Sequence, residues 1–217
     1  MTDAEITRIL LVDDHPMMRR GLRDLLELED DLKPVGEAGS GEQALELADS
    51  LEPDLILMDL NMPGMDGLET VRCLRQRGVD ARIIMFTVSD DQGHVLEALR
   101  NGADGYLLKD MDAEQLVEHI RLAAHGKLAL SPELTMVLAQ AIRERPKSAQ
   151  QNQAVALTKR EKDVLKLIAK GYSNKMIARR LDITEGTVKV HVKRLLNKLG
   201  MRSRTEAAVW VVENNLQ

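Results

Sequence analysis

The chain has 217 residues, of which 44% are hydrophobic and 2% aromatic, and its net charge is −5. This composition is typical of a soluble globular protein with one large domain or two small ones. The apolar runs are too short to span a membrane, and the N-terminus lacks the basic region of a signal peptide. The single cysteine can form no internal disulfide, and the scarcity of aromatic residues argues against a stacking platform for single-stranded nucleic acid. We therefore expect a cytoplasmic protein with no membrane segment.

The net charge hides two parts of opposite sign. Residues 1–142 carry 13 Lys and Arg against 28 Asp and Glu, a net charge of −15, whereas residues 157–217 carry 14 against 6, a net charge of +8. The segment 143–156 between them carries a net charge of +2. This contrast predicts two domains that have different partners.

The acidic part contains five apolar, strand-like runs that alternate with amphipathic helical patterns. The expected strands are Ile9–Val12, Lys33–Glu37, Leu55–Met58, Arg82–Phe86 and Gly105–Leu108. The expected helices lie near 17–28, 41–51, 66–77, 91–101 and 113–125. Strands that alternate with helices predict an α/β, doubly wound parallel sheet of the flavodoxin-like type, here assigned to residues 7–127.

The segment 128–156 is predicted to connect the two parts. Ser131 and Pro132 supply a cap residue and a proline at the first helical position, so a helix is expected from there to about Ile142. Residues 143–156 have no apolar periodicity and are expected to form a flexible linker. Such a linker allows the two domains to touch or to separate.

The basic part, residues 157–217, is predicted to be an all-α domain of four helices. Thr158-Lys159-Arg160-Glu161 forms a capping box at the start of the first helix. A short helix over 174–181, a three-residue turn and a longer helix over 185–199 have the spacing of a helix-turn-helix. Ser203 is positioned to cap the last helix.

Polar residues follow four of the predicted strands at the point where each strand ends. These residues are Asp13 and Asp14 after the first strand, Asp59 after the third, Thr87 after the fourth and Lys109 after the fifth. In the strand order 2-1-3-4-5 these ends are neighbours, so the side chains are expected to converge at one edge of the sheet. Carboxylates this close favour a cation among them, and hard oxygen ligands suit Mg²⁺. Each residue alone also has an ordinary structural explanation, such as a helix cap or a solvated charge.

Three segments resemble the receiver domain of two-component response regulators. They are Leu11–Pro16, Met58–Gly67 and Gly105–Lys109, and the resemblance extends from residue 8 to about residue 127. The resemblance implies that Asp59 accepts a phosphoryl group from a sensor histidine kinase.

The same resemblance implies a role for each polar residue of the site. Asp14, Asp59 and the backbone carbonyl of Asn61 would hold Mg²⁺, with Asp13 in support. The residues that it assigns to the phosphoryl oxygens are Thr87 and Lys109.

Tyr106 is the candidate switch residue of the predicted sheet. The resemblance implies that it fills the space left when Thr87 moves toward the phosphoryl group, although an ordinary half-buried sheet tyrosine would occupy the same position. One departure from the family pattern is Asp110, which stands where many receivers have proline after Lys109. We therefore expect no cis peptide bond at this position.

The helix predicted over 185–199 has a basic face opposite its apolar stripe. The stripe contains Val188, Val192, Leu195 and Leu199, and the residues on or beside the opposite face are Lys189, Val190, Lys193, Arg194 and Asn197. In a helix that lies in the major groove, basic side chains reach guanine edges or phosphates and an aliphatic side chain reaches a thymine methyl group. Alone, the pattern also fits a solvated basic face with one exposed valine.

The neighbouring segments favour the DNA-binding interpretation. Leu157–Glu161, Gly171–Ala178 and Thr187–Val192 resemble the LuxR-type DNA-binding domain over about 155–215. The resemblance implies binding to double-stranded promoter DNA. Five further cations are expected to add phosphate contacts, which supply affinity rather than sequence choice: Lys175, Arg179, Arg180, Arg202 and Arg204.

The last predicted helix is apolar around its whole circumference. Ala207–Val212 offers more apolar surface than a four-helix domain needs to bury. We expect this helix to pair with a second copy of the chain on DNA that has two half-sites, through Ala208, Val211 and Val212. Trp210 alternatively fills the core of its own domain.

Both parts together are similar to the NarL/FixJ family of response regulators. Asn174–Thr184 and Glu206–Val211 are similar to the nitrate- and nitrite-responsive members of that family. The resemblance implies a regulator that is phosphorylated on Asp59, binds promoter DNA as a dimer and controls genes of anaerobic respiration, with RNA polymerase as a further partner. No residue pattern here binds nitrate, so detection is assigned to a membrane sensor kinase, and a different stimulus is the open alternative.

Other classes of protein fit the sequence less well. In haloacid-dehalogenase-like phosphatases an Asp that acts as acid and base stands two residues after the nucleophile, but this chain has Asn61 there, so we expect no enzymatic turnover. Gly36–Gly41 lacks the glycine spacing of a dinucleotide-binding loop, and the nearby Glu37 and Glu42 would repel a phosphate. A LuxR-type regulator that senses a small molecule would share the basic half but would not need the acidic site.

Overall fold

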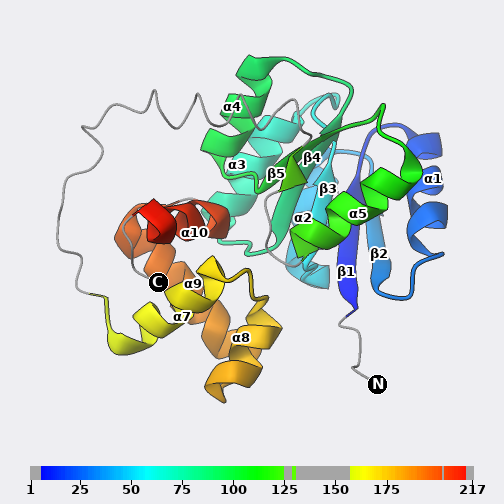
Figure 1. Ribbon diagram of the computed structural model, residues 1–217. Coiled ribbons are helices and arrows are strands. Elements are labelled where there is room, and N and C mark those ends of the chain that lie inside the picture. The colour runs from blue at the N-terminus through cyan, green and yellow to red at the C-terminus, as the bar shows by residue number, and fades with distance from the viewer. Residues whose placement is uncertain (1–5, 125–128, 131–156, 202, 214–217) are drawn as a thin grey trace.

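The computed structural model describes residues 6–124, 129–130, 157–201 and 203–213. The chain forms an N-terminal α/β domain over residues 6–130 and a C-terminal helical domain over residues 157–213, and the two domains lie side by side (Figure 1). No described helix is both long enough and apolar enough to cross a lipid bilayer.

The N-terminal domain is built on a parallel sheet in the order β2-β1-β3-β4-β5-β6. Its strands are β1 (Thr7–Val12), β2 (Leu32–Ala38), β3 (Leu55–Met58), β4 (Arg82–Thr87), β5 (Gly105–Leu108) and β6 (Ala129–Leu130). Its helices are α1 (Pro16–Leu26), α2 (Gly41–Leu51), α3 (Gly67–Arg77), α4 (Gln92–Asn101) and α5 (Ala113–Ala124). The predicted order 2-1-3-4-5 of the first five strands is confirmed.

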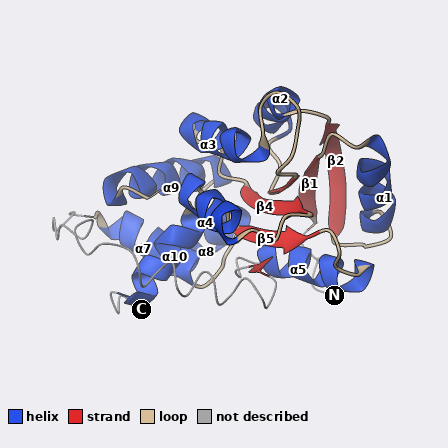
Figure 2. Ribbon diagram, turned by 90° about the horizontal axis from the view of Figure 1, so that it is seen from above, coloured by secondary structure: helices blue, strands red, loops and turns tan. Residues whose placement is uncertain are grey.

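Helices cover both faces of this sheet, as Figure 2 shows for α2 and α3 on one side and α5 on the other. Successive strand residues point to opposite faces. Leu10 and Ile56 pack against α2, α3 and α4, whereas Ile9 and Leu57 pack against α1 and α5. Because both faces are covered, the central strands have continuous apolar runs, Ile9–Val12, Leu55–Met58 and Ile83–Phe86, which is the pattern that predicted them.

The end of the N-terminal domain differs from the sequence expectation. β6 adds a sixth strand, parallel to β5, inside the segment that was predicted to be a connector. A strand of two residues is too short to produce a recognisable hydrophobic pattern, which explains why the sequence does not predict it. The helix predicted over 131–142 and the linker predicted over 143–156 lie outside the described residues.

The C-terminal domain contains the four predicted helices. They are α7 (Lys159–Ala169), α8 (Asn174–Leu181), α9 (Glu185–Leu199) and α10 (Arg204–Glu213). Their shared core includes Val164, Ile177, Val188 and Leu195, each fully buried. The turn between α8 and α9 is tight because Asp182 adopts the left-handed conformation at the end of α8, so the two helices form the predicted helix-turn-helix.

The capping box at the start of α7 also ties α7 to α9. Thr158 Oγ1 accepts the backbone N–H of Glu161, and the Glu161 carboxylate accepts the backbone N–H of Thr158 at 2.8 Å. Lys198 Nζ of α9 donates to the same carboxylate at 2.8 Å. The hydrogen bond from Lys198 holds the pKa of Glu161 below its ordinary value.

Replacing Glu161 by Ala is expected to destabilise the C-terminal domain by about 1–2 kcal/mol, because a helix cap and a tertiary ion pair are lost together. Since the folded-state pKa is depressed, the carboxylate stabilises the domain above the pKa of the unfolded state. The difference between wild type and E161A should therefore shrink as the pH falls through the folded-state pKa. Urea unfolding at several pH values measures both effects, and the exposed neighbour Lys162→Ala is the matched control.

Candidate functional site

The polar residues predicted at the strand ends do converge, and we call this group the acidic pocket: Asp13, Asp14, Asp59, Thr87 and Lys109. Asp13, Asp59 and Thr87 are buried, with exposed fractions of 2%, 3% and 0%. The Lys109 ammonium donates to Asp13 Oδ2 at 2.7 Å and lies 2.9 Å from Asp59 Oδ2. A single buried cation thus links carboxylates that come from β1 and β3.

Two opposing effects act on the pKa values in the acidic pocket: burial disfavours the charged forms, and ion pairing favours them. Burial raises the pKa of Asp59 above its ordinary value, although the hydrogen bond from Lys109 acts in the opposite direction. For Lys109, burial favours the neutral amine, but its hydrogen bonds to Asp13 and Asp59 outweigh this and raise the pKa of the ammonium. Lys109 therefore stays charged, and its positive charge lies between the two acids.

The donor set of the acidic pocket fits a small divalent cation. One ligand atom from each of Asp13, Asp14, His15 and Asp59 lies within 4.8 Å of the others. Three carboxylates supply the hard oxygen ligands that Mg²⁺ prefers. His15 was not predicted as part of this group; it follows Asp14 directly in the chain, and its Nδ1 lies 2.7 Å from Asp14 Oδ1. Asn61 is exposed on the loop after β3, two residues beyond Asp59.

Thr87 and Tyr106 are connected through the loop after β4. Thr87 Oγ1 accepts the backbone N–H of Ser89 at 3.3 Å, and the Tyr106 hydroxyl donates to the carbonyl of Ser89 at 2.8 Å. Both side chains are fully buried, and burial raises the pKa of Tyr106 to about 12. A movement of Thr87 would therefore reach Tyr106 through Ser89, because both side chains are hydrogen-bonded to the backbone of that residue.

The described residues contain no cis peptide bond, and Lys109 and Asp110 are among them.

The backbone around Asp59 is held in place by a close approach to α3. The Gly67 N–H donates to the Leu60 carbonyl at 2.9 Å, and Asp66 caps α3 by accepting from the Glu69 N–H. A Cβ on residue 67 would lie 2.1 Å from the Asp59 carbonyl oxygen. Only glycine lets α3 begin this close to the end of β3.

Gly67→Ala is expected to lower the free energy of unfolding by about 1–3 kcal/mol, because backbone atoms on both sides must move apart. Gly21→Ala is the matched control, since its Cβ would meet nothing within 4 Å in the middle of α1. That substitution should instead stabilise the domain by about 0.5–1 kcal/mol. Equal effects of the two substitutions in chemical denaturation would contradict the packing described for Gly67.

The helix-turn-helix presents the predicted face of α9. Val188, Val192 and Leu195 are buried in the domain core, whereas Val190 is 48% exposed. Other candidate DNA-contacting residues that are exposed on α8 and α9 are Lys175, Arg179, Arg180, Lys193 and Arg194, and Lys189 is partly exposed. Arg204 is instead buried, with an exposed fraction of 6%, so its predicted contact with a DNA phosphate is wrong for this arrangement, and Arg202 lies outside the described residues. The alternation of core and basic faces on α9 is as the periodicity predicts.

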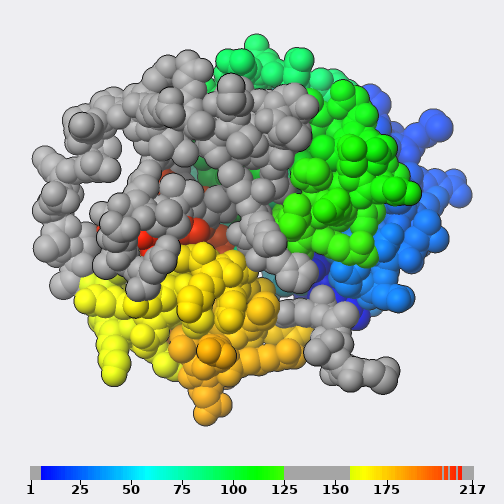
Figure 3. Space-filling model, viewed as in Figure 1, coloured from blue at the N-terminus to red at the C-terminus, as the bar shows by residue number. Residues whose placement is uncertain are grey.

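Part of this basic face is turned toward the N-terminal domain. Lys189 Nζ lies 2.9 Å from Glu52 Oε2, at the end of α2. A cavity of about 950 Å³ separates the two domains, and Val190 and Lys193 line it together with residues of the N-terminal domain. In the space-filling view the C-terminal domain, yellow to red, lies close beside the N-terminal domain (Figure 3). Three of the DNA-contacting candidates, Lys189, Val190 and Lys193, thus face the N-terminal domain of the same chain.

The residues expected to mediate dimerisation divide into three cases. Val211 is 1% exposed and belongs to the core of its own domain, so it has little surface left for a second copy. Ala208 is partly buried against the same core, and so is Trp210, which was expected as an alternative to fill that core. The side chain of Val212 lies outside the described residues.

Known proteins resemble this chain over both domains. The response regulator receiver domain family matches residues 9–121, and the luxR family of bacterial regulatory proteins matches residues 155–211. The nitrate/nitrite response regulator protein NarL of Escherichia coli (strain K12) is 53% identical over 216 residues, which cover 100% of each chain. The nitrate/nitrite response regulator protein NarP of the same strain is 49% identical over 210 residues, covering 96% of each chain.

A solved structure agrees with these matches. The crystal structure of ChrA, a response regulator in a heme-sensing two-component system, is 32% identical and superposes with a TM-score of 0.52. The alignment covers 98% of this chain and 99% of ChrA. The receiver family matches the domain that holds the acidic pocket, and the luxR family matches the domain that holds the helix-turn-helix. The chain therefore belongs to the two-component response regulators that carry a receiver domain and a LuxR-type DNA-binding domain.

Proposed function

We propose that Asp59 is the residue through which this response regulator receives its signal. An oxygen of its carboxylate forms a bond to phosphorus as the bond from phosphorus to a histidine of the sensor kinase breaks. The observation that carries this proposal is the ammonium of Lys109, which lies 2.9 Å from Asp59 Oδ2 and 2.7 Å from Asp13 Oδ2. A buried cation in this place offsets negative charge on a transferring phosphoryl group.

We assign a Mg²⁺ ion to the acidic pocket, held by Asp14, Asp59 and the backbone carbonyl of Asn61, with Asp13 in support. When bound, the ion would supply further positive charge to the phosphoryl oxygens. The close approach of the three carboxylates supports this assignment. Asn61 lacks a group that could act as acid and base toward Asp59, which supports a role in signalling rather than enzymatic turnover.

The phosphoryl group would act on the rest of the receiver domain through Thr87. Its hydroxyl would exchange the contact with the Ser89 N–H for a hydrogen bond to a phosphoryl oxygen. The carbonyl of Ser89 accepts the hydrogen bond of Tyr106, so the loop and the tyrosine would move together. This sequence of contacts is the proposed switch, and it changes the surface formed by β4, α4 and β5.

The output is promoter DNA bound by the helix-turn-helix. We propose that α9 enters the major groove, where Lys189, Val190, Lys193 and Arg194 meet base edges or phosphates. The exposed cations of α8 would add phosphate contacts; they are Lys175, Arg179 and Arg180. A dimer on two half-sites would use Ala208 and Val212 of α10, together with the small exposed part of Val211. On the promoter, the bound dimer would contact RNA polymerase.

We further propose that nitrate or nitrite is the stimulus, detected by a partner kinase. The names of NarL and NarP, at 53% and 49% identity over nearly the whole chain, support this step.

We assign residues 7–127 to the receiver, 128–156 to the connector and 157–217 to the DNA-binding domain. We also propose that the protein is cytoplasmic, because its single cysteine, Cys73, fits a reducing compartment.

The contact of α9 with the receiver domain suggests how phosphorylation reaches DNA. The ion pair with Glu52 competes with any contact between Lys189 and DNA. We infer that the closed arrangement masks part of the reading face, and that phosphorylation shifts the population toward an open form in which α9 is free.

Acetyl phosphate with Mg²⁺ is expected to label the wild-type chain at one residue and to leave Asp59→Asn unlabelled. Asp54→Asn provides the control, because Asp54 precedes the same strand at its other end. Intact-mass spectrometry measures the added phosphoryl group. Labelling of D59N to the wild-type extent would rule out Asp59 as the acceptor.

Glu52→Lys should raise the DNA affinity of the unphosphorylated chain about two- to fivefold, because an exposed ion pair becomes a repulsion of similar size. Glu46→Lys, an exposed site on α2 outside the interdomain cavity, makes the same change of net charge and is the control. Fluorescence anisotropy with a promoter duplex gives both affinities. If the two variants gain equally, the contact between Glu52 and Lys189 does not mask the reading face.

A further inference from the structure

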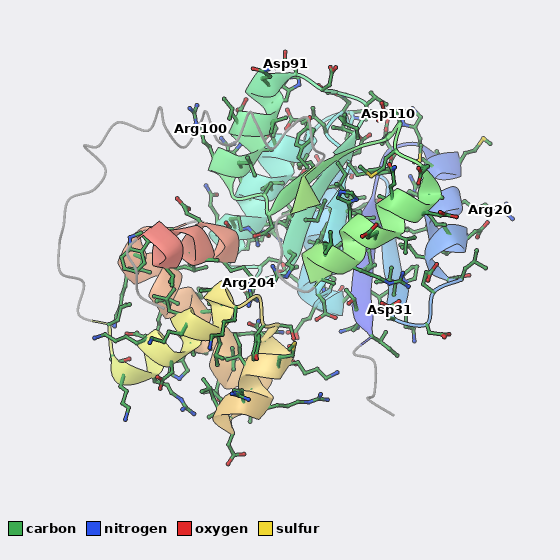
Figure 4. All side chains as sticks on the ribbon, in the orientation of Figure 1. Arg20, Asp31, Asp91, Arg100, Asp110 and Arg204 are labelled. Atoms are coloured by element: carbon green, nitrogen blue, oxygen red, sulfur yellow. The ribbon has the colours of Figure 1, made fainter. Side chains whose placement is uncertain are left out.

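The interdomain cavity lies at the end of the sheet opposite the acidic pocket. β4 shows this directly, since its last residue, Thr87, belongs to the acidic pocket and its first residue, Arg82, lines the cavity. Arg204, the first residue of α10, lines the cavity from the DNA-binding domain. Figure 4 shows Arg204 at the junction of the two domains.

Arg82 is a buried cation on which Asp104 and Asp80 act through space. Its exposed fraction is 5%, and its backbone N–H donates to the Asp54 carbonyl. Among the residues that the structure describes, no hydrogen bond or ion pair reaches its guanidinium. A buried charge in this position carries a large desolvation cost unless an opposite charge lies beside it.

Arg204 is also buried, with an exposed fraction of 6%, and it is only partly satisfied. One terminal nitrogen donates to the Tyr172 carbonyl at 2.6 Å, and the other donates to Asn174 Oδ1 at 3.2 Å and lies 4.0 Å from an Asp80 oxygen. Its Nε is buried and has no hydrogen-bond partner within the described part of the chain. Asp80 is in turn shared, since it accepts a hydrogen bond from Asn174.

The acids around these two arginines are already used. Asp104 lies 2.6 Å from the guanidinium of Arg75 and also accepts the backbone N–H of Ile83 at 2.9 Å. Within this described group, two acids serve three arginines. The acids are Asp80 and Asp104, and the arginines are Arg75, Arg82 and Arg204. The group therefore has one positive charge in excess. Burial and the nearby Arg204 lower the pKa of Arg82 to about 9, so it is still charged at neutral pH.

We propose that Arg82 and Arg204 form a binding site for a small tetrahedral oxyanion of the inorganic phosphate class. Guanidinium groups donate paired hydrogen bonds that match such oxygens, and the orphaned Nε of Arg204 and the unpaired guanidinium of Arg82 supply the donors. The anion replaces the missing negative charge of the group. Because each domain contributes one arginine, binding also favours the closed arrangement, and this last step rests on the masking of α9 proposed above.

The test is a calorimetric titration of the full chain with inorganic phosphate, in EDTA and at ionic strength held constant with NaCl. Without Mg²⁺ the acidic pocket repels the anion, so binding reports on the arginines. Arg82→Met should weaken phosphate binding about tenfold or more. Arg72→Met is the matched control and should bind as wild type does, since Arg72 lines the same cavity but is 53% exposed and paired with Glu69.

A second measurement separates an anion site from a structural role of Arg82. In chloride alone R82M should melt at a higher temperature than wild type, because an uncompensated buried charge has been removed, and phosphate should raise only the wild-type value. Arg82→Lys, which keeps the charge but not the paired donors, should show intermediate phosphate binding. No phosphate binding by wild type, or equal binding by R82M, overturns the proposed site.

Small-angle scattering tests the coupling to domain closure separately. Phosphate should reduce the radius of gyration of wild type and leave that of R82M unchanged. Phosphate binding without compaction would retain the site and overturn its link to the closed form. Neither result depends on phosphorylation of Asp59, which the labelling experiment measures by itself.

Discussion

The ion pair of Lys109 with Asp13 and Asp59 is the contact on which the receiver domain depends. Two buried acids from neighbouring strands repel each other when they carry negative charge, and a cation between them offsets that repulsion. The parallel register of the sheet brings the ends of β1, β3 and β5 to the same edge, and the ammonium of Lys109 then reaches both acids. The same positive charge that offsets the two acids is available to a phosphoryl group.

Much of this site could be predicted from the sequence because topology alone determines it. An acid such as Asp59, placed directly after a fully apolar strand, can lie only at the carboxyl edge of a parallel sheet. His15 was missed, although its place after Asp14 was a usable signal. β6 was missed because two residues carry no pattern. The shared position of Arg82 and Arg204 at the interdomain cavity was beyond prediction, since it depends on how two domains with different patterns meet.

The sheet connects two sites of opposite chemistry. Its carboxyl edge gathers acids around Lys109, and its amino edge places Arg82 against the DNA-binding domain. β4 runs from one site to the other, so a change at Thr87 and a change at Arg82 act on one rigid element. β4 is thus a direct physical connection between the acidic pocket and the interdomain cavity.

We infer that phosphorylation of Asp59 frees α9 from the receiver. Lysine footprinting by mass spectrometry, before and after phosphorylation with phosphoramidate and Mg²⁺, tests it directly. The reactivity of Lys189, now paired with Glu52 at 2.9 Å, should rise on phosphorylation, while that of exposed Lys162 on α7 should not change. Unchanged reactivity of Lys189 in a chain shown to be phosphorylated would contradict the account.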